Sequence, residues 1–305
     1  MSLARGYMSP FELSYIMNGD SDSRKLRLVN LRKNDHGAFG TVARQLASGE
    51  AGEEGLTLLS SVLIHLGRFG SFLRTELLDS PQQAQGLLSA GMKVDPHLDV
   101  SLCHEIACTN SMKRGEVLFL LDLLEKVSNG RRLSLPLSRL NHHPDTFVRS
   151  KAAHLFGAVN ASKSWLSSQL RAPDPRVRAN AIEGCLPIAN EELVPILMTA
   201  LRDPHHRVRA TAALALHPIE THIARSTLMS MLNDPETAPA AAAAWAIAYT
   251  GDATYVPALK ELLRHPDPAR RYLALRPLRA LRNAGDSLTE APQTVDVVTS
   301  ESTID

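Results

Sequence analysis

The sequence predicts an all-α fold, an α-α superhelix in which pairs of short helices stack along the chain. The first observation is a recurring proline turn, whose prolines are spaced 29, 31, 31 and 31 residues apart. These prolines are Pro144, Pro173, Pro204, Pro235 and Pro266. The second observation is a stripe of apolar residues at helical spacing after the turns. A fixed period of this length is typical of a solenoid, because one unit is too small to bury its own apolar face.

Each proline turn should end one helix and begin the next. Proline fixes φ and removes a backbone donor, so the preceding helix cannot continue through it. The pairs Asp174-Pro175 and Asp267-Pro268 then combine an N-cap with a proline at the first helical position. Asp145 can cap the helix after the first turn in the same way.

The helix after each turn carries an inward-facing stripe, counted from the valine of the turn and its fourth and eighth following positions. The stripes of three units are Val148, Ala152 and Phe156; Val177, Ala181 and Cys185; and Val208, Ala212 and Leu216. Alanine at the middle position lets two helices approach closely. A second amphipathic helix precedes each of the later turns, over 162–170, 191–201, 225–232 and 256–263. The repeated unit is therefore a helix, a proline turn and a helix.

Two segments, APDPRVRANAI and DPHHRVRATAA, follow nearly intact the pattern D-P-x-x-x-V-R-x-x-A. This pattern resembles the HEAT-like repeats of the phycobilisome-lyase type, over roughly the second half of the chain. The resemblance implies a HEAT-like solenoid, but it is specific for fold rather than function, because such repeats serve many unrelated proteins.

The resemblance also implies a structural role for the arginine after the valine, which in such repeats lies between neighbouring units and pairs with carboxylates or carbonyls of the turn. The matching residues are Arg149, Arg178, Arg209 and Arg271. Ala240 occupies this position in the fourth unit. Phosphate binding by these arginines is the alternative, which we disfavour because semi-buried arginines are normally paired.

We expect three parts along the chain. Residues 1–140 are helical by pattern but irregular in period, and we interpret them as diverged helix pairs that cap the first end of the stack; a separate helical domain is the alternative. The helices expected there span 10–18, 22–31 (capped by Asp22 or Ser23), 38–47, 54–66, 71–78, 82–90, 100–109 and 115–127. Residues 141–282 hold the regular repeats and end in an arginine-rich unit suited to a terminal cap. Residues 283–305 are acidic, rich in Ser and Thr and free of basic residues, which predicts a disordered acidic tail.

Composition restricts the location and the partners of the protein. A formal net charge of +1 and only two tryptophans argue against a nucleic-acid surface. Three cysteines in 305 residues exclude a disulfide scaffold and suit a reducing compartment. We see no basic-then-apolar leader and no apolar run of the ~18 residues that a spanning helix needs. We therefore expect a cytoplasmic protein without a membrane segment, and the sequence leaves its oligomeric state open.

The sequence contains no catalytic motif at a recognisable spacing. HEAT-like deoxyhypusine hydroxylases build a di-iron site from several His-Glu pairs, whereas this chain has one, His104-Glu105. The histidine pairs His142-His143 and His205-His206 sit in or beside the turns, without a carboxylate at ligand spacing. We expect no metal, no cofactor and no catalytic residue. An enzyme of the phycobilin-lyase or hydroxylase kind remains the alternative.

The favoured function is a non-enzymatic scaffold or adaptor that binds a protein or peptide partner on its concave face. If the stripe faces inward, the second, sixth and ninth positions after each valine should face outward on the helix that lines this surface. Toward the end of the array these columns become aromatic and basic, as binding hot spots do. The predicted partner-binding residues are Leu214, His217, Trp245, Tyr249, Tyr272 and Arg276. Alternatively, Trp245 fills the space left by the alanines before it.

Overall fold

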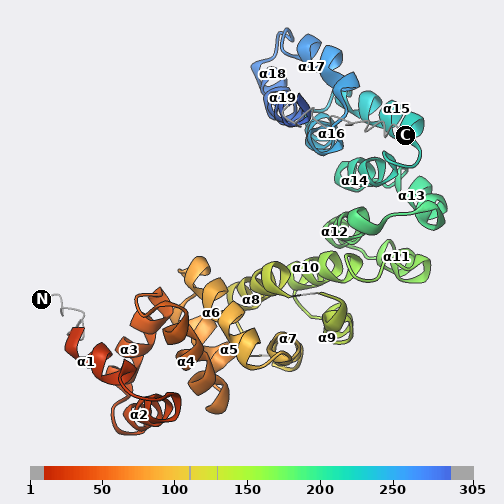
Figure 1. Cartoon of the computed structure of the whole chain (residues 1–305). Helices are drawn as coiled ribbons and strands as arrows, with labels where there is room; N and C mark the ends of the chain where they lie inside the picture. The colour runs from red at the N-terminus through yellow and green to blue at the C-terminus, as the bar shows by residue number, and fades with distance from the viewer. Residues whose placement is uncertain (1–9, 110, 129, 290–305) are drawn as a thin grey trace, which may run out of the picture. The chain divides into compact units, whose positions relative to one another are not determined.

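Helices make up the regular structure of this protein, as the repeat pattern predicts. The computed structural model describes residues 10–109, 111–128 and 130–289, and within these ranges it contains no strand (Figure 1). By its internal contacts the chain forms two units, Met1–Ala189 and Asn190–Asp305. Within the described residues no single helix is long and apolar enough to cross a membrane. Taken together, α4 (Gly52–His65) and α5 (Phe69–Glu76) have the length and the apolar composition of a membrane span, but they are bent by 118° to each other.

The first unit is a row of packed helix pairs. Its helices are α1 (Pro10–Met17), α2 (Ser21–Asn34), α3 (His36–Ser48), α4 (Gly52–His65), α5 (Phe69–Glu76), α6 (Pro81–Val94), α7 (Leu98–Cys108), α8 (Arg114–Val127), η1 (Gly130–Leu133), α9 (Ser134–Leu140), α10 (Thr146–Gly157), α11 (Lys163–Gln169), α12 (Pro175–Cys185) and η2 (Leu186–Ile188). From α4 to α12 each even-numbered helix packs against the next one. One hydrophobic core extends from Ile16 to Phe156, and it passes residue 140 without a break. The division of the chain at residues 140 and 282 stays a prediction.

The second unit continues the alternation of helix and turn. Its helices are η3 (Glu191–Leu193), α13 (Val194–Ala200), α14 (His206–Leu216), α15 (Thr221–Leu232), α16 (Thr237–Thr250), η4 (Ala253–Tyr255), α17 (Val256–Leu262), α18 (Pro268–Leu273) and α19 (Leu275–Thr289). Helix α16 packs against α14, α15 and α19. It therefore lies at the centre of this unit.

Aspartates begin the helices after three of the turns, as predicted. The side chains of Asp145, Asp174 and Asp267 accept hydrogen bonds from backbone N–H groups of the first helical turn. The turn before α14 uses a histidine instead, because His205 Nδ1 accepts from the N–H of Arg207 at 3.2 Å. The expected cap of α2 is wrong: Asp20, rather than Asp22 or Ser23, accepts these bonds.

The inward stripes are confirmed. All nine residues of the three stripes defined from the sequence are buried. The row of helices that follows the turns therefore supplies a shared core, as expected when each unit cannot bury its apolar face alone.

Pro277 shortens the last repeat helix. The helix breaks at Ala274, between α18 and α19, three residues before this proline. Pro277 has no N–H to donate to the carbonyl of Leu273, four residues earlier, so α19 has to start afresh. Helix α19 then continues to Thr289, past residue 282, where the sequence places the start of the disordered tail. Residues 290–305 of that tail lie outside the described residues.

Candidate binding surface

Each of the four turn arginines makes the same pair of hydrogen bonds. In every case Nη1 donates to the backbone carbonyl oxygens six and five residues earlier in the chain. The pairs are Arg149 to His143 and Pro144 at 2.6 and 2.9 Å, Arg178 to Ala172 and Pro173 at 2.8 and 3.1 Å, Arg209 to Asp203 and Pro204 at 2.9 and 3.0 Å, and Arg271 to His265 and Pro266 at 2.8 and 2.7 Å. These bonds close the turn of the arginine's own repeat, and they are the pairing with turn carbonyls that the resemblance implies.

The fourth turn, where Ala240 replaces the arginine, is closed from the next repeat. Arg270 is buried, and its Nη2 donates to the carbonyl oxygens of Asp234 and Glu236. The sequence analysis did not identify this residue, because it stands one position before the column of turn arginines. Its signal is the arginine pair Arg270-Arg271, which none of the other four proline turns carries.

Leu214 does not belong to the exposed surface, so its prediction as a partner-binding residue is wrong. Its side chain is buried, with 7% exposed, and the second-position residues Ser150, Ala179 and Ala210 are buried too. The cause is the packing between successive post-turn helices, α10 against α12 and α14 against α16. A helix in the middle of a stack is covered on its flanks as well as on its apolar stripe.

His217 is held in a polar cluster inside the second unit. Its Nε2 lies 3.1 Å from Asp252 Oδ2, and Arg225 Nη2 donates to the same oxygen at 2.9 Å. The ring of His217 also lies 6.1 Å from that of Tyr255, centroid to centroid. This arrangement joins α14, α15 and η4, so His217 links neighbouring helices of the repeat array.

Electrostatics reinforce this cluster. Burial raises the pKa of Asp252, but hydrogen bonds from Thr254, Arg225 and His217 outweigh this effect and hold the pKa well below its ordinary value. The carboxylate therefore stays ionised and anchors both His217 and Arg225. Burial raises the pKa of the Tyr255 hydroxyl to about 12. That hydroxyl has no hydrogen-bond partner within the described part of the chain.

Trp245, Tyr249 and Arg276 come together on α16 and α19. The rings of Trp245 and Tyr249 are 5.1 Å apart, centroid to centroid, and tilted by 51°. Arg276 Cζ lies 5.6 Å from the centroid of the Tyr249 ring, and its Nη2 donates to the Tyr249 hydroxyl at 3.1 Å. Trp245 is half-buried, whereas Tyr249 and Arg276 are exposed. The two aromatic side chains are therefore held in place by their neighbours while one face remains open.

Tyr272 extends the same exposed surface onto α18. Its side chain is 74% exposed, and the neighbouring Leu275 is 51% exposed. Both residues line an open groove of about 420 Å³ together with Arg276, Arg279, Ala280 and Asn283. Leu275 was missed by the sequence analysis, because the helix break at Ala274 places it as the first residue of a new helix. The signal was Pro277, which requires such a break nearby.

We call the residues Trp245, Tyr249, Tyr272, Leu275, Arg276 and Arg279 the aromatic surface. Four of the six residues predicted from the sequence lie on it. Leu214 and His217 do not, because they pack within the array.

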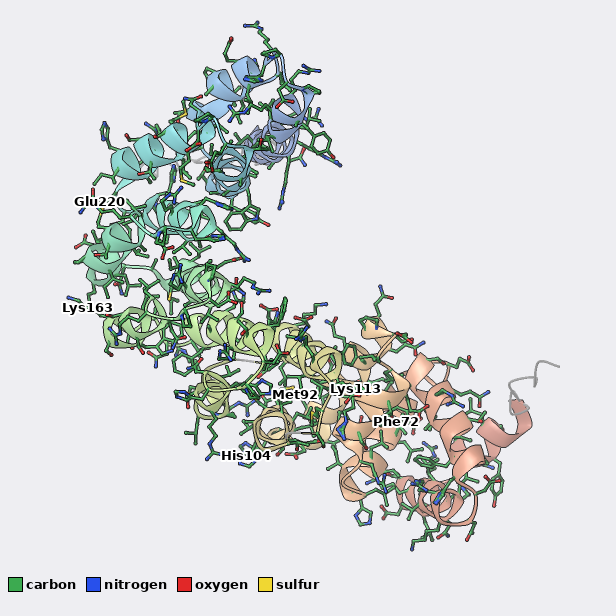
Figure 2. The ribbon with its side chains drawn as sticks, turned by 180° about the vertical axis from the view of Figure 1, so that it is seen from behind. Phe72, Met92, His104, Lys113, Lys163 and Glu220 are labelled. Atoms are coloured by element: carbon green, nitrogen blue, oxygen red, sulfur yellow. The ribbon has the colours of Figure 1, made fainter. Side chains whose placement is uncertain are left out.

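The histidine and the glutamate of the single His-Glu pair contact different residues and do not form one site. His104 lies at the surface of α7 (Figure 2), and its Nε2 is 3.1 Å from Arg139 Nη1. Glu105 Oε1 instead accepts from Arg74 Nη1 at 3.1 Å. Across the described ranges, no group of three or more His, Cys, Asp or Glu side chains is arranged to hold a metal ion.

Comparison with known proteins identifies the repeats. No curated protein matches the chain. A solved crystal structure of an engineered protein has a similarity with a TM-score of 0.38 and 16% sequence identity, over 92% of this chain and 94% of that one. The family model for HEAT repeats matches residues 163–239 and 225–301, which together contain four of the five proline turns. The chain is a HEAT-like repeat protein.

Proposed function

We propose that this protein is a non-enzymatic scaffold or adaptor, and that it holds a protein or peptide partner on the aromatic surface of its last repeats. The observation that carries the proposal is the exposure of Tyr272 and Leu275 beside the ordered Tyr249–Arg276 pair. Tyrosine, tryptophan and arginine are the residues most enriched at binding hot spots. In this proposal the aromatic surface of the second unit takes the role of the concave partner-binding face that we expect for a HEAT-like array.

The preformed contacts of this surface favour binding. Arg276 donates to the Tyr249 hydroxyl and lies over its ring, so both side chains are ordered before a partner arrives. Ordering a long side chain on association otherwise costs about 0.5–1.5 kcal/mol. A partner that stacks on Tyr272 or covers Leu275 would therefore gain apolar burial at a small entropic cost.

The charge around the groove favours a partner segment that is acidic as well as apolar. Arg276 and Arg279 line the groove, and Arg282 follows one turn later on the same helix. The groove lining contains no acidic residue. Complementary charges raise the rate of encounter and fix the orientation of a bound segment. We therefore expect short segments that combine a carboxylate with an apolar anchor.

A peptide selection tests this proposal. The full chain is immobilised, binders are enriched from a displayed library of random peptides, and the best is titrated against the variants Tyr272→Ala and Arg276→Ala. Each variant should weaken binding at least about tenfold, while the melting temperature stays at that of the parent because both side chains are exposed.

The matched control is Tyr15→Ala. Tyr15 is another exposed tyrosine beneath an arginine, with Arg27 Cζ 5.2 Å from its ring centroid, but it belongs to the first unit. This variant should bind like the parent. If no peptide is enriched, or if the selected peptides bind Tyr272→Ala and Arg276→Ala as tightly as the parent, the aromatic surface is not the binding site.

A further inference from the structure

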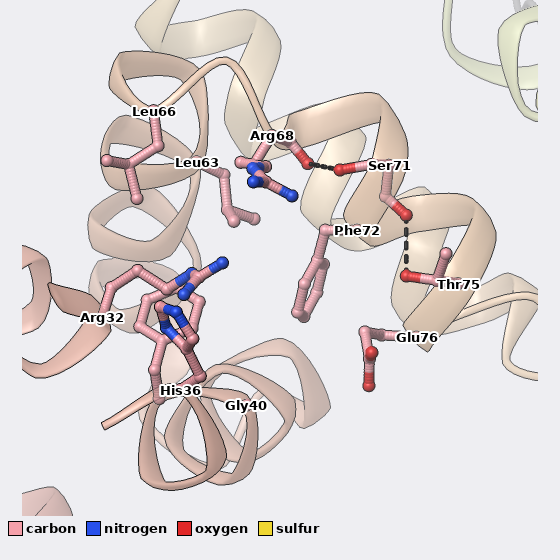
Figure 3. A pocket seen from close by; sticks show the side chains of 11 residues that line it. Arg32, His36, Gly40, Leu63, Leu66, Arg68, Ser71, Phe72, Thr75 and Glu76 are labelled. Carbon is pink, nitrogen blue, oxygen red and sulfur yellow. Dashed lines mark hydrogen bonds between the residues drawn. The ribbon is translucent and has the colours of Figure 1, made fainter. Parts of the chain in front are cut away.

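The first unit contains a second, different cavity. It lies between the end of α2, α3, the end of α4 and α5, and its volume is about 220 Å³. Figure 3 shows the lining: Arg32 and His36 stand on one side, Arg68 lies at the top, and Phe72 and Glu76 stand on the opposite side. None of these residues was singled out from the sequence, because this part of the chain lacks a regular repeat against which an exceptional residue would stand out.

The floor of the cavity is apolar and buried. The side chains of Phe39, Leu63 and Phe72 are buried at 6%, 1% and 6% exposure, yet each contributes to the lining. Arg32 Cζ lies 5.7 Å from the centroid of the Phe39 ring. This cation–π contact directs the guanidinium over the apolar floor.

The rim carries an excess of positive charge. Arg32 and Arg68 form no ion pair with any described residue, and His36 makes no side-chain hydrogen bond there either. The one carboxylate of the lining, Glu76, is already engaged, because its Oε2 accepts from Arg44 Nη1 at 2.7 Å. The two hydroxyl groups of the lining are engaged too: Ser71 and Thr75 donate to the carbonyls of Arg68 and Ser71. The guanidinium groups and the His36 ring are therefore the polar groups left to meet a ligand.

We propose that this cavity binds a monoanion with a small apolar body, a carboxylate attached to an aromatic or branched aliphatic group. The apolar body would cover Phe39, Leu63 and Phe72, and the carboxylate would accept hydrogen bonds from Arg32 and Arg68. Guanidinium groups match the planar geometry of a carboxylate.

The size of the cavity limits the ligand. Pockets for drug-sized ligands measure about 300–1,000 Å³, so this one takes a single ring or one side chain. Two sources share that chemistry: a free small carboxylic acid and the last residue of a peptide with a free carboxyl terminus. This site belongs to the first unit and does not depend on the function proposed for the aromatic surface.

The experiment compares a charged ligand with its neutral counterpart. The full chain is titrated with 3-phenylpropionate and with 3-phenylpropionamide, and binding is followed by ligand-observed NMR. We expect the acid to bind at least about tenfold more tightly than the amide. The variants Arg32→Gln and Arg68→Gln should each weaken binding of the acid several-fold and leave that of the amide unchanged. Arg131→Gln removes the same charge from an exposed site of the first unit and should change neither.

Further titrations distinguish the two sources. A short peptide that ends in phenylalanine is compared with its C-terminal amide and with 3-phenylpropionate. Tighter binding of the free-carboxyl peptide than of the small acid identifies a chain terminus, and equal or weaker binding identifies a free small acid. The proposal is overturned if acid and amide bind equally, if neither binds at about 10 mM, or if Arg32→Gln and Arg68→Gln both bind the acid like the parent.

Discussion

Gly184 on α12 lies directly against the backbone carbonyl of His154 on α10, so that a Cβ atom on Gly184 would stand 2.1 Å from that oxygen. Gly157 on α10 lies close to the backbone of α12, since a Cβ atom added to Gly157 would lie 3.1 Å from the Cα of Gly184. Two neighbouring helices of the array therefore touch backbone to backbone. The neighbour in this contact is main chain, which cannot rotate aside.

Gly184→Ala should therefore destabilise the protein. Inserting a methyl group into a packed contact costs about 1–3 kcal/mol, and here α10 and α12 would have to separate. The measurement is the free energy of unfolding from urea denaturation. The control is Gly40→Ala in α3, where a Cβ meets nothing within 4 Å, and where alanine should stabilise the helix by about 0.5–1 kcal/mol. Equal stability of the two variants would contradict the close approach of α10 and α12.

Removing a turn arginine should loosen its repeat. Arg209→Met leaves the carbonyls of Asp203 and Pro204 without their donor, at a cost of about 1–3 kcal/mol. Hydrogen exchange should rise in the turn before α14. Arg202→Met, which removes an exposed arginine two residues before that turn, should leave exchange unchanged. Equal exchange in both variants would mean that the two hydrogen bonds do not hold the turn.

Asp252→Asn should lower stability by an amount that depends on pH. Near neutral pH the cost should be about 2 kcal/mol, because His217 and Arg225 lose a charged acceptor. The folded-state pKa of Asp252 is lowered from the ordinary 3.8, so its stabilising contribution is complete above that value and is lost as the pH falls below it.

Urea denaturation measures this effect. The difference in unfolding free energy between the parent and Asp252→Asn should shrink as the solution is acidified from about pH 5 to about pH 3. A pH-independent cost for Asp252→Asn would show that ionisation of Asp252 is not what holds the cluster.

The three cysteines should differ in reactivity. Burial raises the pKa values of the Cys103 and Cys185 thiols to about 12, and both side chains are inaccessible. Cys108 is exposed beside His104. Since the thiolate is the nucleophile, iodoacetamide should label Cys108 alone in the native protein and all three cysteines after unfolding, as read by peptide mass spectrometry. Native labelling of Cys185 would contradict the packing of α12.

The acidic C-terminal segment should compete for the groove of the aromatic surface. Residues 290–305 carry Glu290, Asp296, Glu301 and Asp305 and no basic residue, and the groove carries Arg276 and Arg279. Replacing the four acidic residues with their amides should raise the affinity for an acidic peptide at low salt, and the gain should vanish at high salt because exposed charges are screened. Titrations of parent and variant at two salt concentrations measure this, and unchanged affinity at low salt would exclude competition.

The sequence predicted the features that depend on a single repeat. Proline turns, aspartate caps and the valine stripe follow from the physics of a single helix start, and the structure confirms them. Leu214 could not be placed in this way, because its burial depends on the packing of successive post-turn helices, α14 against α16. Periodicity gives the direction in which a side chain points from its own helix, but not which directions a neighbouring helix covers.

The aromatic surface shows the same limit. Trp245 and Tyr249 were found because they share a helix, but their contact with Arg276 depends on how α19 lies against α16. Leu275 was missed because its exposure follows from a helix break. The cavity near Phe72 brings together side chains from α2, α3, α4 and α5, and no spacing along the chain marks such a set.

The hydrogen bonds of the turn arginines also bear on how such an array can evolve. The turn of a repeat that closes itself in this way needs no matching residue in a neighbouring repeat. The repeats with Arg149, Arg178, Arg209 and Arg271 have this independence. The fourth repeat does not, because its turn is closed by Arg270 of the fifth. Recombination that deleted the fifth repeat alone would leave the fourth turn open, so these two repeats should be inherited as a pair.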